Sequence, residues 1–348
     1  MVNPTVLTEH IPPFTRETGS DFSRLSRRIS DAGLLERRRM YYVVRFGAVV
    51  LALAAGCAAF AVLGDSWWQL LVAVWLAGVF GQVGLAAHDL AHRQVFTGRR
   101  PAEIGGLIAA DVLLGMSYGW WMNKHTRHHA NPNHEEKDPD VAPGVLVWSR
   151  RQAGTARGLS AFVGRHQAAL FHLLLTLEGF QLSVASFLAL RNPVVKRPLL
   201  EGSLLILHFV VYFGAIFTVL SPGRAIAFVV VHEGLLGIYL GSVFAPNHKG
   251  MQMLTAEHGL DFLRRQVLTS RNVRGGRFTD ALMGGLNYQI EHHLFPSMPT
   301  PALRQAQAIT EQYCAELGIP YHQTGLIASH REALLYLKSA GEPLRARR

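Results

Sequence analysis

Eight of the 17 histidines of this 348-residue chain fall into four short clusters. The clusters are HDLAH at 88–92, HTRHH at 125–129, NHKG at 247–250 and QIEHH at 289–293. Where such a cluster is helical, residues three or four apart share one face, so its imidazoles can converge. The clustered histidines are His88, His92, His125, His128, His129, His248, His292 and His293.

Clustered imidazoles indicate metal chemistry. Imidazole suits iron, zinc and copper, and a neutral ring binds them without adding negative charge. Eight such ligands exceed what one metal ion uses, so the clusters predict a site for two metals. At this histidine content, HxxHH is expected by chance roughly 0.04 times in a chain of this length. An isolated histidine is ordinarily a surface or hydrogen-bonded residue, so the remaining histidines are kept out of the site.

Four apolar stretches must position these clusters, and each is long enough to cross a bilayer, which takes about 20 helical residues. They cover 42–63, 67–87, 203–220 and 225–246. Very short turns join the first stretch to the second and the third to the fourth, which predicts two helical hairpins. The chain is 49% hydrophobic and only 17% charged, against roughly 25% charged in globular proteins. This composition favours a multi-spanning membrane protein.

The net charge of +10 is explained by orientation in a membrane. Lys and Arg are abundant in the N-terminal segment, between the hairpins and in the C-terminal segment, whereas the short turns hold only Arg224. The positive-inside rule therefore places these three segments, and every histidine cluster, on the cytoplasmic side. A basic balance can also indicate nucleic acid binding, but the chain has no basic helix with interleaved aromatic residues and no basic arm.

Two further apolar stretches, 104–116 and 168–190, are interrupted by polar residues. Asp111 interrupts the first, while Glu178 and Gln181 interrupt the second. We expect both to be helices that lie in the membrane interface or pack on the bundle. His232-Glu233 lies inside the fourth span, where an interhelical pair is favoured over a metal ligand.

The order and spacing of the clusters resemble the histidine boxes of the membrane fatty acid desaturase family, over about 42–296. The resemblance implies an all-α membrane protein with four transmembrane helices in two hairpins and a cytoplasmic helical cap that holds two iron ions. It divides the chain into a cytoplasmic segment 1–41, a four-span domain 42–296 and a cytoplasmic helical segment 297–348.

Carried over residue by residue, the resemblance makes the eight clustered histidines the ligands of a di-iron centre. His88 and His92 match the first box, and His125, His128 and His129 match the second. His292 and His293 match the third, and His248 matches an additional histidine found after the fourth span.

The third box begins with Gln289, where the family usually has histidine. This glutamine resembles the front-end desaturases and their bacterial relatives, which act between an existing double bond and the carboxyl end. We expect Gln289 to be a weak ligand or to support the ligands. Asp89, Glu291 and Asn247 are expected in the same supporting role, and Asp138 and Asp140 are further candidates to orient imidazole N–H groups. Asp89 and Glu291 could instead be solvated or pair with Arg93 or Arg127.

The resemblance implies an O2-dependent enzyme that introduces a cis double bond into an acyl-CoA or a lipid-bound acyl chain. An unactivated C–H bond gives acid–base groups nothing to work on, so no catalytic residue beyond the metal ligands is expected. The chain has no HPGG haem motif, so we expect a separate electron donor, a ferredoxin or cytochrome b5 with its reductase. The expected location is a bacterial cell membrane, with the histidine boxes facing the cytoplasm.

Other readings remain open at this point. A related membrane hydroxylase or ketolase uses the same kind of centre, although QIEHH followed by Leu-Phe-Pro favours the desaturase. A haem or metal carrier would place its ligands inside facing spans, and a transporter needs ionisable groups along a path through the bilayer. The basic residues between 264 and 277 could bind acyl-CoA phosphates or contact anionic lipid headgroups. They are Arg264, Arg265, Arg271, Arg274 and Arg277.

Overall fold

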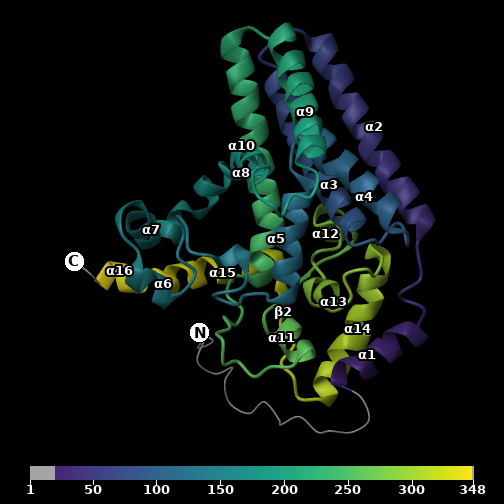
Figure 1. Ribbon diagram of the computed structural model, residues 1–348, viewed down its shortest axis with the longest axis vertical. Coiled ribbons are helices and arrows are strands. Elements are labelled where there is room, and N and C mark those ends of the chain that lie inside the picture. The colour runs from purple at the N-terminus through teal and green to yellow at the C-terminus, as the bar shows by residue number, and fades with distance from the viewer. Residues whose placement is uncertain (1–19, 347–348) are drawn as a thin grey trace.

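The computed structural model describes residues 20–346 and is helical almost throughout. Four long helices form its upper part in Figure 1, namely α2 (Arg39–Leu63), α3 (Gln69–Ala91), α9 (Pro198–Val219) and α10 (Pro222–His248). Each is long and apolar enough to cross a membrane at 1.5 Å per residue, which confirms the four expected spans. Their ends differ from the expected ones, because α3 and α10 continue into the histidine clusters.

Close packing between α3 and α10 holds the centre of the bundle together. A Cβ atom at Gly81 of α3 would overlap the ring of Tyr239 on α10, so only glycine admits the tyrosine here. The Tyr239 hydroxyl donates to the carbonyl of Leu282 at 2.6 Å and accepts from Gln82 Nε2 at 2.7 Å. Small residues that allow close approach are characteristic of helix packing in membranes. The same tyrosine thereby joins both helices to the end of α12 (Arg277–Leu282).

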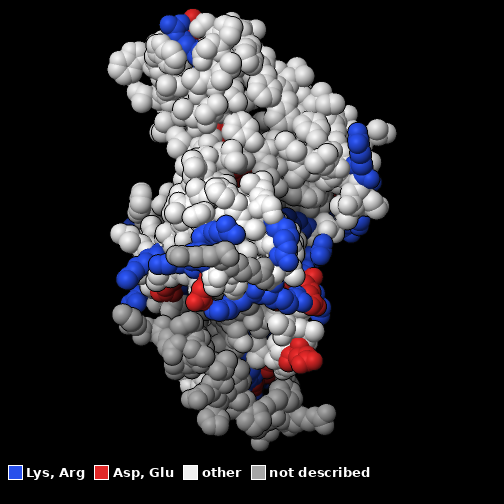
Figure 2. All heavy atoms as spheres, turned by 90° about the vertical axis from the view of Figure 1, so that its left-hand side faces the viewer, with Lys and Arg blue, Asp and Glu red and all other residues white. Residues whose placement is uncertain are grey.

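Charged side chains are scarce over the upper part of the molecule and gather below it. Figure 2 shows Lys and Arg atoms in a band across the molecule, under a largely uncharged surface. Large apolar side chains such as Val62 of α2 and Val210 of α9 are exposed on the upper part, as lipid-facing residues must be. At the far end, Arg224 and Asp65 form an ion pair of 2.6 Å that links the two short turns.

The two interrupted apolar stretches are helical but broken. In the first, α4 (Arg99–Leu107) continues into a π-helix, η2 (Ile108–Leu114). In the second, α7 (Gly158–Leu175) and α8 (Glu178–Ala189) are bent by 82° relative to each other. Together α7 and α8 are also apolar enough for one broken span, so their place in the interface stays a prediction. His232 lies 2.9 Å from the hydroxyl of Tyr212 on α9, an interhelical contact of the expected kind.

Shorter helices form the lower part of Figure 1. They are α1 (Asp21–Asp31), α5 (Tyr118–Ala130), α6 (Arg150–Thr155), α11 (Phe262–Leu268), α13 (Gln289–Leu294), α14 (Thr300–Glu316), α15 (Leu326–Ala340) and α16 (Glu342–Ala346), with a 3₁₀ turn, η3, at Pro139–Val141. An apolar core that includes Leu25, Ile290 and Met298 joins α1, α13 and α14. The first 19 residues of the expected segment 1–41 lie outside the described residues.

One small departure from an all-helical fold is a parallel pair of strands, β1 (Asn272–Arg274) and β2 (Gln323–Gly325). Asn272 pairs with Gln323 in this register. Three residues are too few to show the alternation by which a strand is recognised in a sequence. The pair joins the segment that follows α11 to α15, which comes directly after β2.

Candidate metal centre

Four helices bring the histidine clusters together directly below the bundle. His88 lies in the last turn of α3, and His92 is the residue after that helix ends. α5 carries the HTRHH cluster, and Ser117 caps its start, because the Ser117 hydroxyl accepts a hydrogen bond from the N–H of Trp120. His248 is the last residue of α10, and α13 carries the fourth cluster. Every clustered histidine therefore lies on or beside a helix that packs at this level.

One group contains five histidines. One ring nitrogen from each lies within 4.8 Å of the corresponding atoms of the others. The Nε2 atoms of His92 and His125 are 2.7 Å apart, those of His125 and His129 are 3.0 Å apart, and those of His129 and His292 are 3.1 Å apart. The fifth histidine is His88, which packs against His92, His125 and His292.

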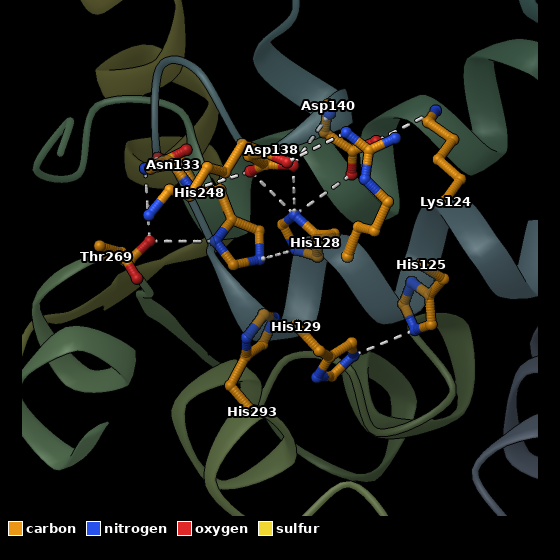
Figure 3. Close-up of polar contacts among 12 residues, drawn as sticks. Lys124, His125, His128, His129, Asn133, Asp138, Asp140, His248, Thr269 and His293 are labelled. Carbon is orange, nitrogen blue, oxygen red and sulfur yellow. Dashed lines mark hydrogen bonds and ion pairs between the residues drawn. The ribbon is translucent and has the colours of Figure 1, made fainter. Parts of the chain in front are cut away.

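The other group contains three histidines, whose outward ring nitrogens are all engaged. His128 Nδ1 lies 3.0 Å from Asp138, and His248 Nδ1 lies 3.0 Å from the carbonyl oxygen of Thr269 (Figure 3). His293 Nδ1 lies 3.0 Å from Oε1 of Gln266. A donor bond from Nδ1 leaves the lone pair on Nε2, and the Nε2 atoms of His128 and His248 face each other at 3.3 Å. This is the arrangement by which outer partners orient metal-binding imidazoles.

The two groups are adjacent. His129 of the first group and His293 of the second stack with their ring centroids 4.2 Å apart. His128 and His129 are consecutive on α5 and belong to different groups. The structure therefore brings all eight clustered histidines into one site with two halves.

Gln289 lies in the second half, where its Nε2 is 2.9 Å from Nε2 of His248. Its Oε1 accepts a hydrogen bond from Nδ2 of Asn247 at 3.1 Å. Asn247 Nδ2 also lies 3.0 Å from the carbonyl oxygens of Val243 and Leu286, which fixes the orientation of that amide. Gln289 thus presents its N–H group, rather than its oxygen, to the histidines.

Two of the expected supporting carboxylates face other partners. Asp89 forms an ion pair with Arg45 of α2, not with Arg93 or Arg127, and it lies 3.6 Å from Nδ1 of His88, beyond hydrogen-bonding distance. Glu291 is fully buried but points away from the imidazoles.

The partners of Glu291 are Asn272 Nδ2 at 2.7 Å and the Tyr321 hydroxyl at 2.8 Å. It therefore ties α13 to β1 and to the segment before β2. Burial raises the pKa of Glu291 to about 7, against the opposing hydrogen bonds from Asn272 and Tyr321.

Asp138 and Asp140 do reach the site. Asp138 contacts His128 through both carboxylate oxygens, and Asp140 lies 3.4 Å from the same nitrogen. Lys124 holds Asp140 from the other side at 3.0 Å. Burial lowers the pKa of His128, but these two carboxylates outweigh burial and leave that pKa raised.

Sequence reasoning missed Gln266 and Thr269, which support His293 and His248. Gln266 lies in α11, a short helix after the fourth span, and Thr269 is the residue directly after that helix. Neither residue belongs to a recognisable motif. Thr269 acts through its backbone oxygen, for which no residue type is a signal. Gln266 also donates from Nε2 to the carbonyl of His129 at 2.9 Å, so it joins the two halves of the site.

The electrostatics of the first half favour neutral, metal-binding imidazoles. Burial, and then the neighbouring imidazoles, lower the pKa values of His92, His125, His129 and His292 well below their ordinary value. Both ring nitrogens of His88 and Nε2 of His293 are buried and have no hydrogen-bond partner among residues 20–346. Buried polar atoms without partners are costly, and a bound metal would satisfy them. The residues present therefore fit metal ions in both halves.

Comparisons with known proteins agree with this chemistry. A family model described as "Fatty acid desaturase" matches residues 65–325. The chain is 30% identical over 346 residues to an "Acyl-lipid (9-3)-desaturase" of Physcomitrium patens, covering 96% of this chain and 65% of that protein. It is 27% identical over 344 residues to a "Delta(6)-fatty-acid desaturase" of Caenorhabditis elegans, covering 94% and 76% of the two chains.

A third relative is a "Delta(8)-fatty-acid desaturase" of Euglena gracilis, 26% identical over 333 residues, with 92% of this chain and 78% of that protein covered. These three relatives are eukaryotic, so the expected bacterial location stays a prediction. Because the family model covers well over half of the sequence and includes all four histidine clusters, the chain belongs to the fatty acid desaturase family.

Proposed function

We propose that this protein is an O2-dependent front-end acyl desaturase with a di-iron centre. The observation that carries the proposal is the division of eight buried or half-buried histidines into a group of five and a group of three. Each group offers enough converging nitrogens for one metal ion, and two such groups do not suit a single haem. Iron is the metal that this family uses.

The front-end assignment is supported by Gln289 and by the relatives. Gln289 stands at the first position of the third box, and two relatives are named for the Delta(6) and Delta(8) positions. Both names denote insertion at a position counted from the carboxyl end. We propose the same class of position here, on an acyl-CoA or a lipid-bound acyl chain.

The reaction removes two hydrogen atoms from adjacent methylenes and leaves a double bond between them. Two electrons from a donor and two protons combine with these hydrogens to reduce O2 to two waters. Iron held by the eight histidines would supply the chemistry that activates O2 against an unactivated C–H bond. The chain itself must hold the ligands, exclude water and fix one register of the acyl chain.

The surroundings of His88 are suited to excluding water and to fixing the register of the acyl chain. Trp121 stacks on His125 with ring centroids 4.4 Å apart, and Phe244 lies 6.4 Å from the ring of His88. Both aromatic residues border the apolar core of the bundle, which also contains Met116 and Leu240. An apolar wall beside the ligands excludes water and accepts a hydrocarbon chain.

The proposed topology follows from the charge distribution. Two helical hairpins, α2–α3 and α9–α10, would cross the membrane, and the basic band would face the cytoplasm with a helical cap around the histidines. The division at 41/42 and 296/297 is part of this proposal. The electron donor would be a separate ferredoxin or a cytochrome b5 with its reductase.

The proposal is tested by expressing the protein in a host without polyunsaturated lipids, with and without added linoleate, and analysing the lipids. A new double bond between the existing one and the carboxyl group supports the proposal. A new bond on the methyl side contradicts the front-end assignment, and a hydroxylated product contradicts desaturation.

Two histidine variants make this test specific. His128→Ala should abolish the new unsaturation, whereas His166→Ala, at an exposed histidine of α7 outside the groups, should retain it. Iron analysis of the purified protein should give two ions per chain. One haem or one zinc per chain would contradict the di-iron centre.

A further inference from the structure

A cavity lined by several charged residues opens beside α5, and none of the clustered histidines belongs to its lining. Its volume is about 480 Å³, within the range of small-molecule sites. It lies between α4, α5 and the segment that leads from α8 into α9. One face of α5, at Gly119, Met122 and Thr126, forms its wall, so the cavity adjoins the helix that carries three of the clustered histidines.

The cavity is strongly basic. Four cations line it, namely Arg93, Arg99, Lys196 and Arg197, together with two carboxylates, Glu103 and Glu201.

Both carboxylates are already engaged. Glu103 pairs with Arg197 at 3.3 Å. Glu201 accepts from the Ser117 hydroxyl at 2.6 Å and from the N–H of Gly119 at 3.0 Å. The other three cations have no hydrogen-bond or ion-pair partner within the described part of the chain. The lining therefore presents uncompensated positive charge to the cavity.

The backbone conformation of Arg93 indicates that its side chain has a functional role. Arg93 has φ = 55°, in the left-handed region, directly after the end of α3. Its N–H donates to the carbonyl of Leu90, and the N–H of Gln94 donates to the carbonyl of Asp89, both at 3.0 Å. Helices that end with this pair of bonds usually have glycine at the left-handed position. An arginine there retains backbone strain at a position beside a metal ligand, His92, which is typical of a functional residue.

We infer that this cavity binds the phosphate groups of the acyl carrier, either the phosphates of coenzyme A or the phosphate of a phospholipid headgroup. Arginine presents a planar fork of N–H donors that matches phosphate oxygens, and lysine adds a point charge. This inference rests on the proposed function, because it assigns the polar end of that enzyme's substrate.

The rim of the cavity fits an amphiphile. Ile104 follows Glu103 on α4 and is 58% exposed, and Leu199, two residues after Arg197, is 87% exposed. An anionic head bound among the cations would therefore have apolar surface close by, as a membrane amphiphile requires. Arg93 directly follows His92 of the five-histidine group, so a head bound at Arg93 would hold the carboxyl end of the acyl chain near the metal ligands. This agrees with insertion of the double bond at a position counted from that end.

Two of the five basic residues suggested by the sequence for this role, Arg264 and Arg271, are engaged elsewhere. Arg264 pairs with Asp21 and Asp261, and Arg271 is fully buried against the carbonyl of Pro246 and against Glu332. They stabilise the fold around α11 and are not free to bind a ligand.

Binding can be measured without turnover. The full chain, purified in a neutral detergent without reductant, is titrated in one arm with coenzyme A and in the other with a short-chain phosphatidylcholine. We expect saturable binding in one arm, weakening as salt rises. Saturation by coenzyme A identifies an acyl-CoA substrate, and saturation by the phospholipid identifies a lipid-bound one. Saturation in neither arm overturns the inference.

Arg93→Gly is the decisive variant, because glycine relieves the strained backbone and should leave the fold intact. Loss of one charge-assisted phosphate contact should weaken binding about tenfold or more. Arg99→Gln should weaken it similarly, whereas Arg100→Gln, at an exposed neighbour outside the cavity, should not. Equal effects of all three variants would show unspecific surface attraction and overturn the inference.

Failure of the proposed desaturase function can be distinguished from failure of the cavity assignment. If the host produces no new double bond but Arg93→Gly still weakens binding, the cavity assignment stands and the desaturase proposal fails. If desaturation occurs and Arg93→Gly leaves both KM and binding unchanged, the cavity assignment fails alone.

Discussion

The carboxylate of Asp138 lies 3.0 Å from Nδ1 of His128, on the opposite side of the ring from His248. The same carboxylate accepts hydrogen bonds from the backbone N–H groups of Asn133 at 2.8 Å and Asp140 at 2.9 Å, so the loop after α5 holds it rigidly. Because Nδ1 donates to Asp138, the lone pair of His128 is directed from Nε2 toward the other histidines.

Asp138→Asn should weaken metal binding without unfolding the protein. An amide has no charge and offers one acceptor oxygen, whereas both oxygens of Asp138 accept bonds. Loss of such a partner typically reduces metal affinity by about 10- to 100-fold. The measurement is the iron retained per chain during titration with a chelator.

Glu136→Gln is the matched control, because Glu136 is an exposed carboxylate two residues away whose ion pair is with Arg151. It should retain iron like the unchanged protein. If Asp138→Asn also does so, Asp138 does not orient the ligand.

Gln289→Leu should leave two irons per chain but reduce desaturation. Asn247 fixes the oxygen of Gln289 away from His248, so this side chain presents an N–H group and is not placed to be an oxygen ligand. Leucine is similar in size and cannot form either hydrogen bond. Iron content and product formation are measured on the same preparation.

His248→Ala provides the contrast, since it removes one of the three nitrogens in the second half of the site. We expect it to lower the iron content toward one per chain. A similar fall in Gln289→Leu would show that Gln289 binds metal.

The parts of the structure that sequence could predict are those set by local patterns. The spans follow from runs of apolar residues, and His88, His128 and His292 were identified because imidazoles at helical spacing are rare by chance. Asp138 could be named as a candidate supporting group because a carboxylate near HTRHH can accept a hydrogen bond from an imidazole N–H group.

The remainder depends on contacts between distant segments. The partner of Asp89 is Arg45 on the preceding span, 44 residues away, and not a nearby arginine. Thr269 supports His248 through a backbone oxygen that any residue supplies. The cavity beside α5 combines residues of α4 and α9 with residues at or after the ends of α3 and α8. The strain at Arg93 is a backbone property. None of these leaves a pattern in a single sequence.

Gly237→Ala should destabilise the protein because Gly237 of α10 is where the break between α7 and α8 packs. A Cβ atom there would overlap the backbone oxygen of Leu175, which cannot move independently of its helix. Overpacking of this kind costs about 1–3 kcal/mol of the free energy of unfolding. Thermal unfolding in detergent measures the effect.

Gly214→Ala is the matched control on α9, because a Cβ atom there meets nothing within 4 Å. It should leave the unfolding temperature unchanged or slightly raised. If both variants unfold at the same temperature as the unchanged protein, α7 and α8 do not pack on α10 at Gly237.

Asp111→Asn should remove a pH dependence of stability between about 4 and 8. Burial, and then the charge of Glu201, raise the pKa of Asp111 to about 8, from 3.8 in its ordinary state. Over this range the unfolded chain ionises at Asp111 while the folded protein keeps it neutral, so stability falls as pH rises toward 8. Asparagine is neutral throughout and can still accept the hydrogen bond from the N–H of Tyr118. The unfolding temperature of the variant minus that of the unchanged protein should therefore increase from pH 5 to about pH 8. A difference that stays constant with pH would show that Asp111 is already ionised in the folded protein.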